Sequence, residues 1–141
     1  MEIGEALGHL RTQRVGMLIT QRRDGRPQSS NVSYAIGDDR IIRVSLTEDR
    51  AKTKNLRRAP VASLHVNRPD LWAYAVVDAD VELSPVAAAP DDATVEELVA
   101  LYRSLQGEHE DWDDYRSAMV ADRRLVARLR PTHAYGMWSS G

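Results

Sequence analysis

Apolar and polar residues alternate along most of the first half of the chain, as they do in strands with one buried face. Residues 15–21 form the first expected strand, and the Asp24-Gly25 pair after it is typical of a tight hairpin turn. Further strands are expected at residues 27–36 and 40–46, so that the three form a meander. An amphipathic helix at residues 3–12 precedes them.

Two later runs extend the β pattern. Residues 61–66 alternate, and residues 71–85 form a run that is long for one strand, with Trp72 and Tyr74 on the same face. Long strands of this kind often bend around a barrel. The chain is expected to end with a short segment at residues 125–129, Pro131 and a final strand at residues 132–138.

Helical spacing replaces alternation in the second half. Apolar residues recur every three or four positions after Asp91, which predicts a helix that Gly107 ends. A further helix is expected to run to about residue 122, with acidic residues at its start, as the helix dipole favours. Six or seven strands with two substantial helices predict a mainly β fold, a small closed β-barrel decorated with helices.

Composition indicates one domain spanning residues 1–141, since 43% hydrophobic residues supply enough apolar sequence for a core. The absence of cysteine excludes disulfides, thiolate catalysis and cysteine metal sites. No apolar stretch approaches the ~20 residues that span a bilayer, and residues 1–5 do not resemble a signal peptide. We therefore expect a soluble, cytoplasmic protein without a membrane segment, and the net charge of −2 argues against nucleic-acid binding.

Charge is distributed unevenly along the chain. Residues 14–58 hold 11 basic and 5 acidic side chains, whereas residues 78–122 hold 2 basic and 13 acidic ones. The only two lysines, Lys52 and Lys54, lie where a strand gives way to a basic helix within residues 49–58. Helix starts offer free N–H groups to anions, and lysine offers a point charge. This pattern predicts a phosphate anchor, although a solvated basic helix face explains the same charges.

Several catalytic signatures are missing from the sequence, namely G-x-G-x-x-G, the P-loop, H-E-x-x-H and G-x-S-x-G. His109 lies in an acidic segment, but the spacing matches no EF-hand or zinc pattern, so helix capping and a solvated acidic face explain it better than a metal. His65 is expected to pack or hydrogen-bond within its strand. No metal site is predicted, and no catalytic side chain is identified.

Seven segments, taken together, resemble one family. They are Asp24-Gly-Arg-Pro-Gln-Ser-Ser-Asn-Val, Arg43-Val-Ser, Asp49-Arg-Ala-Lys-Thr-Lys-Asn-Leu-Arg-Arg, Trp72-Ala-Tyr-Ala-Val, Ala87-Ala-Ala-Pro-Asp-Asp-Ala-Thr-Val-Glu-Glu-Leu, Asp111-Trp-Asp-Asp-Tyr-Arg and His133-Ala-Tyr-Gly. In this order they resemble the deazaflavin-dependent split β-barrel oxidoreductases, within the FMN-binding split-barrel group that includes pyridoxamine 5′-phosphate oxidase. The resemblance extends over nearly the whole chain.

The resemblance implies a homodimer that holds two molecules of coenzyme F420, a deazaflavin with a phosphate and an acidic tail, in clefts between the subunits. It assigns the phosphate and the tail to residues around the start of the basic helix. These are Ser45, Arg50, Ala51 through its backbone, Lys52 and Thr53, with Lys54 as a peripheral helper.

The deazaflavin ring is expected to lie against the strand that carries Gln28, Ser30 and Asn31, whose amide and hydroxyl groups can bind its pyrimidine edge. The resemblance further implies that the second subunit walls the cleft with three side chains, Trp72, Tyr74 and His133. Packing within the subunit's own core remains an alternative role for each of these three.

The expected reaction follows from the cofactor. A reduced deazaflavin passes a hydride to an electron-poor acceptor such as a quinone, a conjugated lactone or a tetrapyrrole, so few catalytic side chains are required. Two other functions stay open, an FMN-dependent oxidase of the pyridoxamine-phosphate kind and a non-enzymatic carrier of a cofactor or tetrapyrrole. The sequence identifies neither the physiological substrate nor the proton donor.

Overall fold

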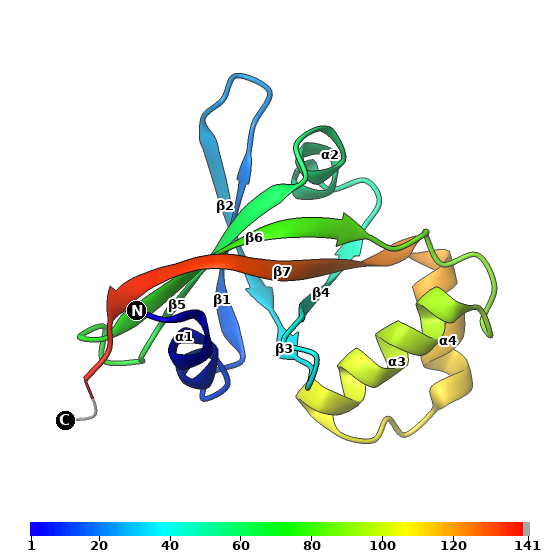
Figure 1. The fold of residues 1–141 in the computed structure, drawn as a ribbon. Coiled ribbons are helices and arrows are strands. Elements are labelled where there is room, and N and C mark those ends of the chain that lie inside the picture. The colour runs from blue at the N-terminus through cyan, green and yellow to red at the C-terminus, as the bar shows by residue number, and fades with distance from the viewer. Residues whose placement is uncertain (140–141) are drawn as a thin grey trace.

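The computed structural model describes residues 1–139 as one curled antiparallel sheet with helices around it (Figure 1). The strands are β1 (Val15–Gln21), β2 (Pro27–Ser33), β3 (Ala35–Ile36), β4 (Ile42–Thr47), β5 (Val61–Asn67), β6 (Tyr74–Leu83) and β7 (Arg124–Met137). The helices are α1 (Ile3–Leu10), α2 (Ala51–Arg58), α3 (Ala93–Gln106) and α4 (Trp112–Ala121). This architecture confirms the expected mainly β fold class.

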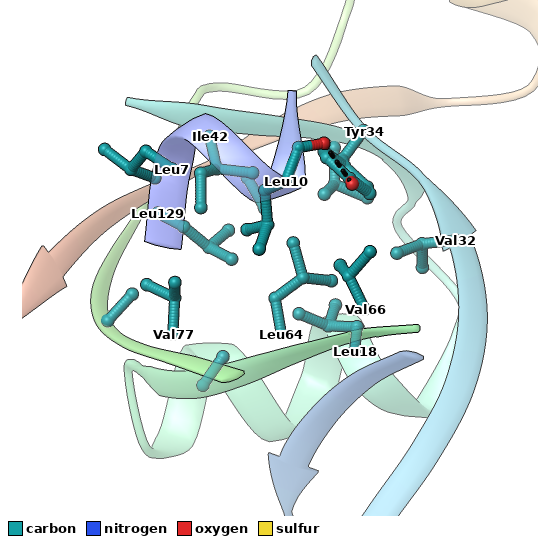
Figure 2. Packing of buried hydrophobic residues seen from close by; sticks show 14 of the residues in the cluster. Leu7, Leu10, Leu18, Val32, Tyr34, Ile42, Leu64, Val66, Val77 and Leu129 are labelled. Carbon is teal, nitrogen blue, oxygen red and sulfur yellow. Dashed lines mark hydrogen bonds between the residues drawn. The ribbon is translucent and has the colours of Figure 1, made fainter. Parts of the chain in front are cut away.

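Alternating burial along the strands builds the main hydrophobic core on the inner face of the sheet. Leu18 of β1 and Leu64 of β5 are fully buried, while their neighbours in sequence face outward. Leu7 and Leu10 of α1 pack into the same cluster beside Leu129 of β7 (Figure 2). Each such leucine contributes about 1.5–3 kcal/mol by leaving water, so the core is the main source of stability.

The second expected strand, residues 27–36, is interrupted at Tyr34. The buried Tyr34 hydroxyl donates a hydrogen bond of 2.6 Å to the carbonyl of Leu10 in α1, and its backbone N–H bonds to Arg14. The chain therefore leaves β1 after Ser33, and only the two residues of β3 pair with β4. The predicted three-stranded meander was wrong in this respect, because β4 pairs along its length with β7.

Pro131 does not divide the C-terminal strand as expected. Residues 124–137 form the single strand β7, which pairs with both β6 and β4. A register shift opposite Asp78 and Ala79 accommodates Pro131, which lacks a backbone donor, at a bulge in the ladder.

The sheet order is β2-β1-β5-β6-β7-β4-β3, and within residues 1–139 no ladder joins β2 to β4. The two strands nevertheless approach each other. The barrel is therefore split along one side, which confirms the split β-barrel that the family resemblance implied, whereas the closed barrel predicted from the strand pattern alone was wrong. No helix in the described part of the chain is long and apolar enough to cross a membrane.

Helices α3 and α4 form a hairpin beside β3, β4 and β7, on the opposite side of the sheet from α1 in the view of Figure 1. Asp92 caps α3 by accepting a 2.8 Å hydrogen bond from the N–H of Val95, and Asp111 caps α4 in the same way. A second, smaller core joins the hairpin to the sheet through Val126 of β7. The hairpin thereby covers one border of the gap between β2 and β4.

Candidate functional site

A cavity of about 400 Å³ lies where the split in the barrel meets the α3–α4 hairpin. Its size is typical of small-molecule sites. The lining combines the strands that border the split, the start of α2 and both helices of the hairpin. The lining residues are Asn31, Val32, Ser33, Ser45, Lys52, Leu101, Tyr102, Leu105, Gln106, Tyr115, Met119 and Arg124.

The start of α2 brings Lys52 into this cavity. Arg50 occupies the N-cap position in an extended conformation, and its side chain makes no capping hydrogen bond. The first N–H groups of a helix have no partner within the helix, so the start at Ala51 offers donors to an anion. Lys52 Nζ donates a 3.3 Å hydrogen bond to the hydroxyl of Ser30 in β2. This bond holds Lys52 against β2, next to the N–H groups at which an anion would bind.

The electrostatic environment of Lys52 is cationic. Burial lowers the pKa of Lys52 below its ordinary value, and the charges of Arg50 and Arg124 lower it further. None of the described residues that line the cavity is acidic. An anion in this position would therefore stabilise the charged lysine and offset the repulsion between the three cations.

Arg124 is a site residue that the sequence-based prediction missed. It is the first residue of β7, and its Nη1 donates a 3.2 Å hydrogen bond to the hydroxyl of Ser45 in β4. Its Nε is buried and has no hydrogen-bond partner within residues 1–139, where the nearest carboxylate oxygen, on Asp122, lies 3.9 Å away. No local pattern distinguishes Arg124 from its exposed neighbour Arg123, so only the fold reveals it.

The structure brings together some of the predicted phosphate and ring residues but not all. Asn31, Ser45 and Lys52 line the cavity, and Ser30 contacts Lys52. Thr53 does not reach it, because its fully buried hydroxyl donates to the carbonyl of Thr47.

Gln28 is held away from the cavity by a second contact between β2 and α2. Its Oε1 accepts a 2.8 Å hydrogen bond from Nδ2 of Asn55, which also donates to the hydroxyl of Thr20. Gln28 does not line the cavity. In the structure its side chain therefore fixes the position of α2 against the sheet.

The three predicted cleft-walling residues lie elsewhere in this subunit. Trp72 is 85% exposed in the loop before β6, and none of the three lines the cavity. Tyr74 stacks on His65 with ring centres 5.3 Å apart, and His65 Nε2 lies 3.1 Å from Oδ1 of Asn67. The prediction that His65 packs and hydrogen-bonds within its strand is confirmed. His133 is exposed beside Tyr135 on β7.

Aromatic residues of the α3–α4 hairpin form the opposite wall of the cavity. Tyr102 and Tyr115 contact each other and belong to a cluster with His109 and Trp112. The Tyr115 hydroxyl donates to the carbonyl of Leu98, and burial raises its pKa to about 12 although the charge of Arg124 opposes this. The Tyr115 side chain is therefore held by a hydrogen bond and stays neutral at physiological pH.

His109 contributes to the cap of α4. Its Nδ1 accepts a 2.9 Å hydrogen bond from the backbone N–H of Asp111, which agrees with the capping role expected from the sequence. Within residues 1–139 no three His, Cys, Asp or Glu side chains are grouped closely enough to hold a metal ion.

Comparison with known families bears directly on this split barrel. Residues 4–138 match the model of the family described as pyridoxamine 5′-phosphate oxidase. The chain belongs to that family.

Solved structures agree with the family assignment and differ in what they bind. A structure described as an F420 reductase is 28% identical, with a TM-score of 0.64 over 86% of this chain and 89% of that one. A pyridoxamine 5′-phosphate oxidase-related, FMN-binding protein from Nostoc punctiforme is 14% identical, with a TM-score of 0.62 over 95% and 80%. The heme storage protein from Vibrio cholerae is 15% identical, with a TM-score of 0.70 over 97% and 96%.

Proposed function

We propose that this member of the pyridoxamine 5′-phosphate oxidase family is an oxidoreductase that uses reduced coenzyme F420 and transfers its hydride to an electron-poor small molecule. One observation carries the proposal. Lys52 is partly buried beside the uncapped start of α2, in a cavity where two arginines add positive charge and no acidic side chain lines the wall. Such a site favours a phosphate or an acidic tail.

The binding energy available from this arrangement is substantial. A hydrogen bond to a charged group contributes about 1.5–3 kcal/mol, and here Lys52, Arg50 and the first N–H groups of α2 can donate to the same anion. In the described part of the chain Lys52 bonds a neutral hydroxyl, that of Ser30, and no carboxylate, so the lysine gains most from an added negative charge. We therefore assign the coenzyme phosphate to Lys52, Arg50 and the backbone of Ala51.

The choice of F420 over FMN rests on sequence likeness. The basic run at residues 49–58 resembles the deazaflavin-dependent enzymes, and the structure at 28% identity is described as an F420 reductase. The split barrel and its cationic cavity also suit FMN, which carries a phosphate. A carrier without turnover is a further candidate, since a heme storage protein shares the fold.

Residues of a second subunit complete the cleft in this proposal. Trp72 and Met137 are 85% and 71% exposed, and Met137 pairs with Tyr74 across β6 and β7. An apolar surface of this kind suits a partner. A homodimer in which the partner's Trp72, Tyr74 and His133 wall the cofactor cleft would bury it.

The chain's own chemical task is limited under this proposal. The coenzyme supplies the hydride, whereas the protein binds its anionic end at Lys52, orients the ring beside Asn31 and excludes water. These tasks require no catalytic acid or base, which agrees with the lack of any catalytic motif in the sequence.

Titration of the purified protein with F420 and with FMN, followed by tryptophan fluorescence, tests the cofactor. We expect F420 to bind more tightly than FMN. Tighter binding of FMN would refute the choice of F420 and indicate FMN as the cofactor. Turnover of quinone and conjugated-lactone acceptors with reduced F420 then separates an enzyme from a carrier. A mass measurement in solution tests the dimer, since a monomer cannot form the shared cleft.

Lys52→Ala tests the anchor itself. We expect at least tenfold weaker F420 binding, equivalent to about 1.4 kcal/mol. Lys54→Ala is the matched control, because Lys54 lies on the same helix, is exposed and does not line the cavity. We expect it to change the affinity by less than threefold. Equal affinities of wild type and Lys52→Ala would refute the anchor assignment.

A further inference from the structure

Arg124 gives the cavity a second cationic wall, distinct from Lys52. Lys52 enters from α2 and contacts Ser30 of β2, whereas Arg124 enters from β7 and contacts Ser45 of β4. Among the described residues the buried Nε of Arg124 has no hydrogen-bond acceptor, and the exposed carboxylate of Asp122, 3.9 Å away, is the one acidic group paired with it. A buried donor without an acceptor destabilises the fold unless a ligand or water satisfies it.

Apart from Gln106, the side chains of the α3–α4 hairpin that line the cavity with Arg124 are apolar or aromatic. Tyr115 is close enough for the charge of Arg124 to affect its pKa, and Tyr102 packs against Tyr115. Aliphatic side chains complete the same wall, namely Leu101, Leu105 and Met119. The wall suits a flat, apolar body that can lie against tyrosine rings.

A planar guanidinium beside such a wall recognises a particular kind of molecule. Arginine donates two parallel hydrogen bonds to a carboxylate, and Nε together with one terminal nitrogen is the usual pair of donors. Nη1 of Arg124 donates to Ser45, while the buried Nε has no acceptor among residues 1–139. A neutral flat molecule would not provide an anionic acceptor for Arg124. A carboxylate without an apolar body would leave the aromatic wall exposed to water.

We propose that Arg124 and the α3–α4 wall bind the hydride acceptor, and that this acceptor is an electron-poor, conjugated carboxylic acid. The inference rests on the proposed function and adds the substrate class. Asn31, which we assign to the coenzyme ring, also lines this cavity, so an acceptor held there lies next to the ring position. Reduction of its conjugated double bond adds a hydride from the reduced coenzyme to one carbon and a proton from water to the other.

Binding of two isosteric probes to the coenzyme-free protein tests the inference. We expect isothermal titration calorimetry to show that 2-naphthoate binds at least tenfold more tightly than 2-naphthamide, since only the acid supplies the negative charge. Arg124→Met should abolish this preference, whereas Arg124→Lys should retain part of it. Tyr102→Ala should weaken both probes equally, because it removes contact with their shared ring.

Coenzyme binding separates this role from a second cofactor anchor. Arg124→Met should weaken F420 binding much less than Lys52→Ala does, because Arg124 adds charge near the anchor but is not assigned a bond to the phosphate, and 2-naphthoate should not displace F420. Equal binding of acid and amide to wild type would overturn the inference, as would a tenfold loss of F420 affinity in Arg124→Met. Failure of F420 to bind at all would instead refute the proposed function, and the comparison of probes would stand on its own.

Discussion

Glu97 on α3 is expected to hold the helical hairpin to the barrel, and Glu97→Gln measures how strongly. The Glu97 carboxylate is only 17% exposed. It accepts a 3.0 Å hydrogen bond from Nε of Arg43 in β4 and a 2.9 Å bond from Nε of Arg128 in β7. These arginines hold the pKa of Glu97 below its ordinary value, the bonds from Arg128 being the larger cause, while burial opposes them.

The cost of the substitution follows from this geometry. Glu97 accepts one charge-assisted bond from Arg43 and three from Arg128, and such bonds contribute about 1.5–3 kcal/mol each. Both arginines, however, remain about a quarter exposed, and each keeps a second carboxylate partner, so solvent and the second partner reduce the loss. We therefore expect Glu97→Gln to lower the free energy of unfolding by about 2 kcal/mol at pH 7, and Tm by about 6 °C. Glu96→Gln is the matched control, since its carboxylate is 56% exposed and pairs with Arg116. We expect it to cost much less than Glu97→Gln, because solvent screens this exposed pair.

Chemical denaturation across pH distinguishes an ionic role from a steric one. A carboxylate whose pKa is lowered by folding stabilises the protein above its unfolded pKa, and the contribution disappears as pH falls through the folded pKa. The difference between wild type and Glu97→Gln should therefore be full at pH 7 and shrink below about pH 4.5, the ordinary value. A difference that is unchanged at low pH, or equal to that of Glu96→Gln, would refute the ionic clamp.

Two other substitutions test the fold. Gly136→Ala should destabilise the protein by about 3 kcal/mol or more in urea unfolding, because φ is +149° and a new Cβ would clash with the carbonyl oxygen of Tyr74. Gly8→Ala is the control and should be neutral or stabilising, since nothing lies within 4 Å of its new Cβ. Tyr34→Phe removes the buried bond to Leu10 and should cost about 1–2 kcal/mol, and an unchanged midpoint of unfolding would show that this bond does not hold α1.

Local sequence patterns identify those parts of this fold whose structure depends on neighbours in the chain. The alternation of residues 61–66 predicts β5, and the Asp24-Gly25 pair predicts the hairpin between β1 and β2, where Gly25 adopts a φ of +85°. The spacing after Asp91 and the stop at Gly107 predict α3 to within two residues at its start. The residues that determine each of these features lie within about one turn or one strand of it.

The features that the sequence did not predict depend on distant contacts. The interruption at Tyr34 follows from a hydrogen bond to Leu10, 24 residues earlier. Pro131 is tolerated inside β7 because the partner strand β6 shifts register opposite it. The partners of Tyr34 and Pro131 lie in distant segments, so the local sequence around each residue does not identify them.

The candidate site follows the same rule. The scarcity of lysine and the start of a helix identify Lys52, because both are local properties, and the structure places it in the cavity. Arg124 meets Lys52 there only because β7 pairs with β4 and the split brings β2 close to β4. Of the two basic residues that line the cavity, sequence reasoning therefore predicted Lys52 and missed Arg124.

The split itself explains why a cavity with this lining can exist. In a closed barrel, a ladder between β2 and β4 would fill the gap, and Ser30, Asn31 and Ser45 would lie against a neighbouring strand with little room for a ligand. Because no ladder forms there in the described residues, these polar side chains border an open edge, and α2, β7 and the α3–α4 hairpin supply the remaining walls. The feature that departs most from the simplest barrel is thus the one that creates the cavity.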